Sequence, residues 1–337
     1  MIWANLLHLG FNLWDDHLNT PEHPAYDEKG ERRPVAWGVS DAVRFDERVW
    51  HDLTQRTHDI GMNMVVIDLG EAVVYPSHPE LAVKGSWTPA KLREELSRLR
   101  KMGLEPVPKL NFSCCHDAWL KDYSRMVSTP TYYRVVRDLV SDVCEIFDHP
   151  RFVHIGMDEE TPIVQAGYEF SVSRQGPLWY HDLARIATMV ESHGARAWMW
   201  GDPRWGNETF ARNVSKRIVQ SNWYYWKDLR KIEAEIDDPG FAVKPGKPAT
   251  AGENKHAELK AFLELDAEGY DQIPCATNWN NPLDMELVAD FALRRIAPER
   301  LKGFLFATWE SMLDDPKALA KHDEYFKLAG KIIRDHS

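Results

Sequence analysis

The amino-acid sequence predicts a single-domain α/β protein with the architecture of a (β/α)8 TIM barrel, for three reasons. Short apolar runs alternate with longer stretches of helical periodicity along the whole chain, which is typical of repeated βα units around a parallel sheet. Eight such runs occur, as many as a closed barrel needs. No Gly-rich dinucleotide fingerprint follows any of them, and this disfavours an open, doubly wound sheet.

Each expected strand is one of these apolar runs. The eight are residues 4–13, 62–69, 104–112, 152–157, 195–200, 217–223, 272–278 and 301–308. No linker divides the chain and no repeat beyond the βα period is visible, so we expect residues 1–337 to form one barrel domain.

Helical periodicity fills the segments between the strands. The expected helices are residues 44–60, 89–102, 132–147, 178–193, 257–268, 282–296 and 316–334. The clearest is 89–102, because Thr88 offers an N-cap, Pro89 suits the first helical position and Gly103 ends the segment. Two polar insertions, 17–34 and 237–255, interrupt the pattern. The first follows the C-terminal end of a strand, where barrel loops form active sites.

Composition excludes several classes of partner. The chain carries 41 basic and 52 acidic residues, for a net charge of -11, and lacks the clustered Lys and Arg that nucleic acids or anionic membranes require. No run reaches transmembrane length. The N-terminus shows neither a basic leader nor a cleavage site, so we expect a cytoplasmic protein, although a chain freed of its signal peptide would read the same. The four cysteines lack metal-type spacing and are expected to be reduced thiols.

Polar and aromatic residues gather at the strand ends that bind substrate in a barrel. Carboxylates and amides hydrogen-bond hydroxyl groups, and aromatic rings stack on the apolar faces of sugars, so this mouth is predicted to bind carbohydrate. Cleavage of a glycosidic bond needs an acid and a negative group, and a second carboxylate nearby raises the pKa of its neighbour. The residues concerned are Asn12, His116, Asp158, Glu159, Trp200, Asp202, Trp223, Tyr225, Asn278, Trp309 and Glu310.

The segment HIGMDE, residues 154–159, resembles the His-x-Gly-Gly-Asp-Glu signature of the family 20 glycoside hydrolases, the β-N-acetylhexosaminidases. Residues 103–108, ahead of Asn111 and His116, look like the third-strand segment of that family. Residues 200–202 and the pair at 309–310 are similar to its Trp-x-Asp and Trp-x-Glu motifs. The resemblance covers roughly residues 62–310, most of the barrel.

This resemblance implies removal of a terminal β-linked N-acetylhexosamine with retention, assisted by the substrate. The 2-acetamido oxygen of the sugar would attack the anomeric carbon, so no protein nucleophile and no cofactor would be used. Asp158 would orient the acetamido group, and Glu159 would act as general acid and then base. Trp223, Tyr225 and Trp309 would wall the pocket. Glu310 would accept hydrogen bonds from hydroxyls on the far side of the ring.

The chain departs from the family pattern at several positions. The first expected strand carries no Arg to hold the outer hydroxyls, so His8, Asn12 or Asp15 would have to replace it. Lys109 and Asn111 stand where acids are usual, Met157 replaces the second Gly of the signature, and Asn278 begins a segment where a Tyr is expected. The configuration of the sugar, the linkage and the oligomeric state stay open.

Other interpretations compete with this one. Glu159 and Glu310 could form the carboxylate pair of a retaining glycosidase for a sugar without an acetamido group. A catalytically silent sugar-binding barrel is a second alternative, and a metal-dependent hydrolase using His8, His116 and Asp158 is a third. The acids could also simply cap a helix, as we expect of Glu160. His154 is expected to bond to a neighbouring strand or to Asp202.

Overall fold

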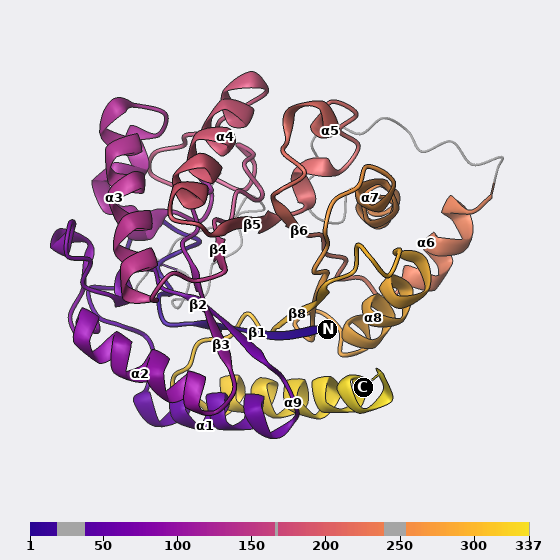
Figure 1. Ribbon diagram of the computed structural model, residues 1–337, viewed down its shortest axis with the longest axis horizontal. Coiled ribbons are helices and arrows are strands. Elements are labelled where there is room, and N and C mark those ends of the chain that lie inside the picture. Colours follow the sequence, from indigo (N-terminus) through magenta and orange to yellow (C-terminus); the bar gives the residue numbers. More distant parts are fainter. Residues whose placement is uncertain (19–37, 166–167, 239–253, 337) are drawn as a thin grey trace.

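The computed structural model describes residues 1–18, 38–165, 168–238 and 254–336. Eight parallel strands form one sheet in the order β6-β5-β4-β3-β2-β1-β8-β7, and helices surround it (Figure 1). The outer strands β6 and β7 meet through isolated bridges, Gln220 with Gln272 and Trp223 with Cys275, which bring the sheet round to a nearly closed barrel. The predicted (β/α)8 fold is therefore confirmed. The two predicted polar insertions lie largely outside the described residues.

All eight predicted strands are confirmed, and each observed strand is shorter than its apolar run. The strands are β1 (Ile2–His8), β2 (Met64–Asp68), β3 (Glu105–Lys109), β4 (Phe152–His154), β5 (Arg196–Trp200), β6 (Val219–Ser221), β7 (Cys275–Thr277) and β8 (Gly303–Ala307). The apolar runs extend past the strands because buried residues continue into the connections at the mouth, as at Leu9 and Leu110.

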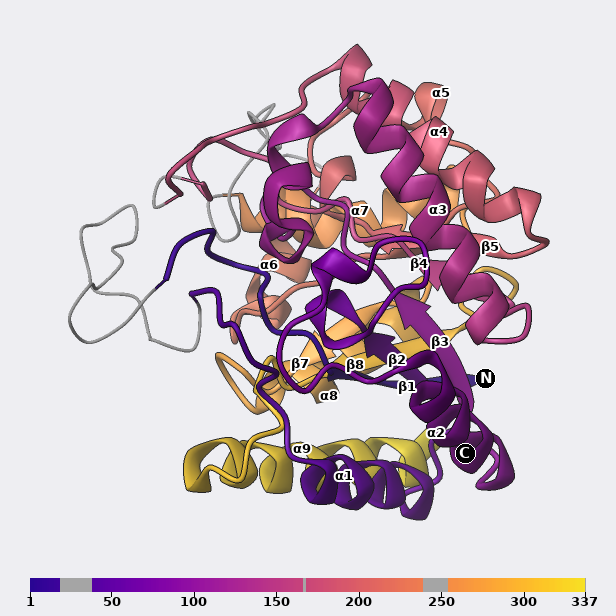
Figure 2. The same cartoon turned by 90° about the vertical axis from the view of Figure 1, so that its left-hand side faces the viewer.

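Helices pack against the outside of the barrel, and all seven predicted helices are confirmed. They are α1 (Glu47–Asp59), α2 (Pro89–Lys101), α3 (Pro130–Ile146), α4 (Pro177–Ser192), α7 (Lys255–Ala267), α8 (Leu283–Arg295) and α9 (Pro316–His336). Thr88 caps α2 as expected, because its side chain accepts a hydrogen bond from the Lys91 amide. The last helix, α9, lies beside α1 in both views (Figures 1 and 2).

Two short α-helices and four 3₁₀ segments are not among the predicted elements. They are α5 (Phe210–Asn213), α6 (Leu229–Ile236), η2 (Gly70–Ala72), η3 (Pro79–Leu81), η4 (Ala118–Met126) and η5 (Asp202–Arg204). One or two turns are too short for periodicity to reveal. No helix within the described residues is both long enough and apolar enough to cross a membrane.

The strands separate two apolar cores. Residues that face outward pack against the helices, whereas a smaller inner cluster fills the barrel with side chains such as Leu6, Val66, Val107, Trp198 and Leu305. Inner layers of branched and aromatic side chains make the lower barrel solid, so a ligand can enter only from the end where the strands finish. Figure 2 shows this end on the left, where the chain leaves β4 for its long connection to α4.

Gly303 gives a test of barrel closure. A Cβ atom at this position would lie 2.0 Å from the carbonyl oxygen of Ile2, between β8 and β1. We expect Gly303→Ala to lower the free energy of unfolding by at least about 3 kcal/mol, because neither strand can move without disturbing the barrel. Gly194→Ala is the control, since its Cβ would meet nothing within 4 Å and adds only the strain of a φ of 78°, about 1–2 kcal/mol. Equal losses in urea titrations of the two variants would contradict this account.

Candidate active site

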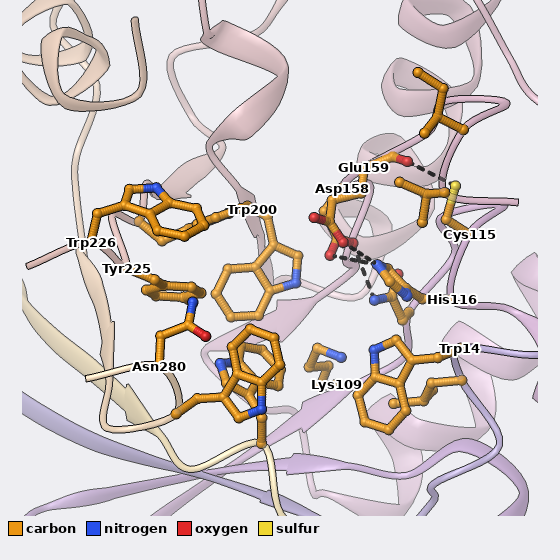
Figure 3. A pocket seen from close by; sticks show the side chains of 17 residues that line it. Trp14, Lys109, Cys115, His116, Asp158, Glu159, Trp200, Tyr225, Trp226 and Asn280 are labelled. Atoms are coloured by element: carbon orange, nitrogen blue, oxygen red, sulfur yellow. Dashed lines mark hydrogen bonds and ion pairs between the residues drawn. The ribbon is translucent and has the colours of Figure 1, made fainter. Parts of the chain in front are cut away.

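A cavity of about 360 Å³ opens at the carboxyl ends of the strands, within the size range of small-molecule sites. Acids and a histidine lie on one side of it, and aromatic rings lie on the other (Figure 3). The described residues that line it are Leu13, Trp14, Lys109, Asn111, Cys115, His116, Asp158, Glu159, Ile163, Val164, Trp200, Trp223, Tyr225, Trp226, Trp279, Asn280 and Trp309.

His116 joins the two predicted catalytic acids. Its Nε2 lies 3.3 Å from Asp158 Oδ2 and 3.1 Å from Glu159 Oε2. Asn111 adds a hydrogen bond, with its Nδ2 donating to Asp158 Oδ1 at 3.2 Å. Asp158 is almost buried, whereas the Glu159 side chain is 28% exposed. Glu159 is therefore the more accessible of the two carboxylates.

The charge on His116 dominates the electrostatics of this cluster. Burial alone would lower the pKa of His116, but the negative charge of Asp158 and hydrogen bonds to both acids raise it to about 10. Burial likewise opposes ionisation of Asp158, yet the charge and hydrogen bond of His116 bring the pKa of Asp158 below its ordinary value. At Asp158, the residue predicted to orient the acetamido group, the charge of His116 thus favours ionisation.

Asp202 holds Glu159 through the backbone. Its Oδ2 accepts a hydrogen bond from the Glu159 amide at 2.8 Å. Burial and the nearby charge of Asp158 raise the pKa of Asp202 well above its ordinary value. Asp202 thus supports the acid pair from behind and is not among the described residues that line the cavity.

The backbone that carries the acids is strained. Gly156, Met157 and Glu159 have φ angles of 71°, 70° and 52°, a region that only glycine adopts at low cost. A Cβ at Gly156 would lie 1.8 Å from Asn111 Oδ1, which explains why the chain has glycine there. Such conformations persist where surrounding structure enforces them, and they often mark functional sites. Here they turn two successive carboxylates toward the same histidine.

A buried ion network anchors this strained segment from below. The Arg174 guanidinium is 1% exposed and binds both carboxylate oxygens of Glu160. It also donates to Asp182 Oδ2 at 3.2 Å and to the carbonyl of Phe112 at 2.6 Å. Glu160 accepts in addition from the Cys114 amide at 3.2 Å. The prediction that Glu160 is structural is confirmed, because it ties the connection after β4 to the connection after β3.

Aromatic rings form the opposite side of the cavity. Trp223 and Tyr225 stack with ring centroids 4.7 Å apart, and Trp200 lies against Trp309 at 5.6 Å. Figure 3 shows Trp200, Tyr225 and Trp226 facing the acids across the cavity. Rings in this arrangement offer flat apolar faces against which a ligand ring can pack. All four predicted aromatic residues, Trp200, Trp223, Tyr225 and Trp309, thus line the cavity.

Four predicted substrate-binding residues are absent from the described lining: Asp202, which holds the Glu159 amide, and Asn12, Asn278 and Glu310. The side-chain amide of Asn12 donates to the Ser40 carbonyl at 2.9 Å, and its Oδ1 accepts from Arg44 at 2.6 Å, so it fastens the chain after β1. Asn278 is fully buried and donates to the Lys321 carbonyl at 3.0 Å. Glu310 is half-buried beside the mouth and is absent from the described lining.

His154 also differs from its prediction. Its Nδ1 accepts from the Gly156 amide at 3.2 Å, and its ring packs on Trp200 at 4.7 Å, without a bond to Asp202. Burial and the positive charge of Lys109 lower the pKa of His154 well below its usual value. His154 is therefore a neutral ring that supports the backbone of the segment carrying the two acids.

Thiol chemistry finds no support in the site. The four cysteines are free and buried, as predicted for reduced thiols. Burial raises the pKa of Cys115 well above its ordinary value, although this residue lines the cavity. A thiol that stays protonated is a poor nucleophile, and the Sγ of Cys115 instead donates to the Glu159 carbonyl at 2.8 Å.

The metal interpretation is weakened by the same geometry. Donor atoms of His116, Asp158 and Glu159 lie within 4.8 Å of one another and could surround an ion. His8, the third residue of the predicted metal set, instead lies beside Asp68 on the barrel floor. A metal bound by His116, Asp158 and Glu159 would have to displace the proton that the two acids hold on His116.

Several lining residues are not among the predicted site residues. Trp14, Ile163 and Val164 come from connections whose course the sequence does not reveal. Trp226, Trp279 and Asn280 follow strands β6 and β7, so position alone could have included them. Lys109 is the most surprising, since a buried lysine at the end of β3 is costly and needs compensation.

The fold and site together define a (β/α)8 barrel whose mouth holds an acid pair opposite aromatic rings, in a cavity of about 360 Å³. Known proteins were compared with this chain. No protein-family model matches the sequence, and no curated protein matches it.

Solved structures do match the fold. The exo-β-N-acetylglucosaminidase of Vibrio harveyi, a family 20 enzyme bound to N-acetylglucosamine, aligns with all of this chain at 15% identity and a TM-score of 0.61. The N-acetyl-β-hexosaminidase of Streptomyces plicatus aligns with 97% at 14% identity and a TM-score of 0.59. The β-N-acetylhexosaminidase of Bacteroides fragilis aligns with 99% at 13% identity and a TM-score of 0.57. This chain spans 55%, 63% and 69% of those three chains, respectively.

Removing the Arg174 guanidinium tests the anchoring network. We expect Arg174→Met to lower the free energy of unfolding by about 3–5 kcal/mol, because Glu160 and Asp182 would then be buried without their cation. Arg125→Met serves as the control, since its ion pair with Glu169 at 3.6 Å is exposed, and its loss should cost less than about 1 kcal/mol. Chemical denaturation measures both. An Arg174→Met protein as stable as the wild type would show that the network does not anchor the segment.

Proposed function

We propose that this protein is a glycoside hydrolase that removes terminal β-linked N-acetylhexosamine with retention, using the substrate's own acetamido group. The main support is the position of the acids in the cavity. The carboxylates among the described lining residues belong to Asp158 and Glu159, which are neighbours on the chain and both contact His116. Glu310, the expected partner in a two-carboxylate mechanism, is absent from that lining. With no second carboxylate at a separate position among the described lining residues, the acetamido group of the substrate is the second catalytic group of this proposal.

In the first step the acetamido oxygen attacks the anomeric carbon while the bond from this carbon to the leaving oxygen breaks. Glu159 gives its proton to the leaving oxygen. Asp158, held as an anion by His116, accepts the N–H of the acetamido group and stabilises the positive charge that develops on it. A neutral bicyclic intermediate results when that N–H proton shifts to Asp158.

In the second step Glu159 takes a proton from water, and the resulting hydroxide attacks the anomeric carbon from the side the leaving group left. The bond to the acetamido oxygen breaks, the proton on Asp158 returns to nitrogen, and configuration is retained. Aromatic residues on the opposite side would hold the ring and the acetamido methyl group. His116 stays hydrogen-bonded to Glu159 Oε2 in both steps, so Oε1 is the oxygen that gives and accepts the proton.

A panel of aryl β-glycosides tests the proposal. We expect hydrolysis of the N-acetylglucosamine or N-acetylgalactosamine glycoside with a kcat/KM at least about 100-fold above those of the glucose and galactose glycosides, because these lack the internal nucleophile. Faster cleavage of the sugars without the acetamido group would contradict substrate assistance. Turnover lost on chelation would favour the metal-dependent alternative, and binding without turnover would favour the silent barrel.

Two variants assign the roles of the acids. Glu159→Gln should lower kcat/KM by about 10²–10⁴-fold on a poor leaving group and much less on an activated one, because kcat/KM reports the first step and only the poor leaving group needs protonation there. Asp158→Asn should lower kcat about 10²-fold or more on both, because it removes the negative charge beside the acetamido group. Glu169→Gln, on the same connection but exposed, is the matched control and should keep wild-type kinetics. An unchanged Glu159→Gln enzyme on the poor leaving group would exclude Glu159 as the acid.

A further inference from the structure

A buried lysine contributes to the floor of the cavity. Lys109 is the last residue of β3 and only 1% exposed, yet its side chain lines the pocket. Its amine forms a short ion pair with Asp68 at the end of β2. In Figure 3 Lys109 lies below the two carboxylates, between Trp14 and Trp200 in that view. This cation is therefore close to the acids but outside their cluster.

Lys109 belongs to a polar layer that crosses four neighbouring strands. His8 pairs in register with Asp68, Asp68 with Lys109, and Lys109 with His154. All four side chains are at most 1% exposed. Layers inside such a barrel are normally filled by branched apolar side chains, as they are just below at Leu6, Val66 and Val107 in this one. A polar layer directly under the cavity needs a reason.

The layer carries no net charge. Burial, together with the charge of Lys109, lowers the pKa of His8 and that of His154, so both rings are neutral. Burial opposes the charge of Asp68, but Lys109 and His8 still bring its pKa below the ordinary value. The layer thus presents one cation and one anion side by side, an arrangement that suits hydroxyl groups, which both accept and donate hydrogen bonds.

Hydrogen-bonding capacity in this layer is unused. Among the described residues, Asp68 Oδ1, His8 Nε2 and His154 Nε2 are buried without a hydrogen-bond partner. The ammonium group of Lys109 has three donors, and the hydrogen bond that the described residues provide for it goes to Asp68. Buried polar groups are nearly always satisfied by protein, water or ligand. Since Lys109 is the member of the layer that lines the cavity, its remaining donors are the ones a ligand can reach.

We propose that Lys109 determines specificity by donating hydrogen bonds to sugar hydroxyls remote from the cleaved bond, while its ion pair with Asp68 offsets the cost of burying its amine. The inference rests on the proposed function, because that function places the anomeric carbon at Glu159 and so directs the far ring carbons away from it. The ligand is an uncharged sugar whose terminal hydroxyls are unsubstituted. A sugar carboxylate or sulfate is disfavoured, because the cations Lys109 and His116 are already paired with the carboxylates of Asp68 and Asp158.

Deoxygenated substrates test this role. Aryl β-N-acetylglucosaminides lacking the hydroxyl at carbon 3, 4 or 6 are compared with the parent on the wild type and on Lys109→Met. We expect at least one deoxy substrate to lose about 10- to 100-fold in kcat/KM on the wild type, as the loss of a hydrogen bond to a charged group implies. On Lys109→Met the loss at that same position should shrink to less than about 3-fold, because the donor is gone.

Asp68→Asn is the matched control. Both variants break the same buried ion pair, so both should unfold at lower denaturant concentration. Only Lys109→Met removes the donor that faces the cavity, and Asp68→Asn should therefore keep most of the wild-type discrimination at that position. The proposal is overturned if Lys109→Met discriminates as strongly as the wild type, or if no deoxy substrate is disfavoured by the wild type.

Binding separates this proposal from the proposed function. If no acetamido glycoside is hydrolysed, N-acetylglucosamine and its three deoxy forms are titrated against the tryptophan fluorescence of the pocket. The ratio of the Kd of a deoxy sugar to that of N-acetylglucosamine is then compared among the proteins. A ratio that Lys109→Met changes and Asp68→Asn does not change supports the role of Lys109 in sugar binding, even though the catalytic proposal has failed. Absence of sugar binding, or ratios equal in the wild type and Lys109→Met, overturns it.

Discussion

The contact of one charged histidine with two carboxylates is the interaction on which the site depends. Asp158 and Glu159 follow one another on the chain, and without a cation their proximity would favour protonation of one of them. His116 is charged and reaches both at 3.3 and 3.1 Å, which keeps Asp158 an anion in a place where burial alone would neutralise it. An anion and a neighbouring proton carrier can then coexist in one small cavity.

The barrel supplies what this contact needs. The connection after β3 brings His116 and Asn111, and the connection after β4 brings the acids through a backbone that is strained at Met157 and Glu159. Strain of this kind costs about 1–3 kcal/mol per residue and must be enforced by the surroundings. Arg174 binds to both connections, and Asp202 accepts a hydrogen bond from the Glu159 amide. Buried ion pairs and hydrogen bonds therefore hold the strained backbone in place.

Much of this could be predicted from sequence, for identifiable reasons. The strands are recognisable because parallel strands buried on both faces are continuous apolar runs, and the acids because they follow one of those strands directly. Asn12 and Asn278 also follow strands, but a strand end has two faces and a connection can turn either way. Sequence position does not state that Asn12 faces Arg44 or that Asn278 faces α9.

Lys109 is the opposite case, because it lines the cavity but is not among the site residues predicted from the sequence. A lysine at the end of a strand suggests a solvated side chain, because ammonium groups are rarely buried. Its burial is possible only because Asp68 occupies the matching register of the neighbouring strand, 41 residues earlier in the chain. Pairing between strands is a property of the closed barrel, and so the polar layer becomes visible only when the register is known.

The protonation state of His116 tests the central claim most directly. In protein labelled with ¹⁵N-histidine, the imidazole signals of His116 can be assigned by their absence from a His116→Gln variant and followed from pH 5 to 11. The account predicts that both ring nitrogens stay protonated through pH 8 and titrate near a pKa of about 10, and that Asp158→Asn moves this pKa downward. Since this pKa is raised above its unfolded value, the accompanying stability is full below about pH 6.5 and is lost as pH rises toward 10. A His116 that titrates near 6.5 or below would contradict the account, because no cation would then join the two acids at neutral pH.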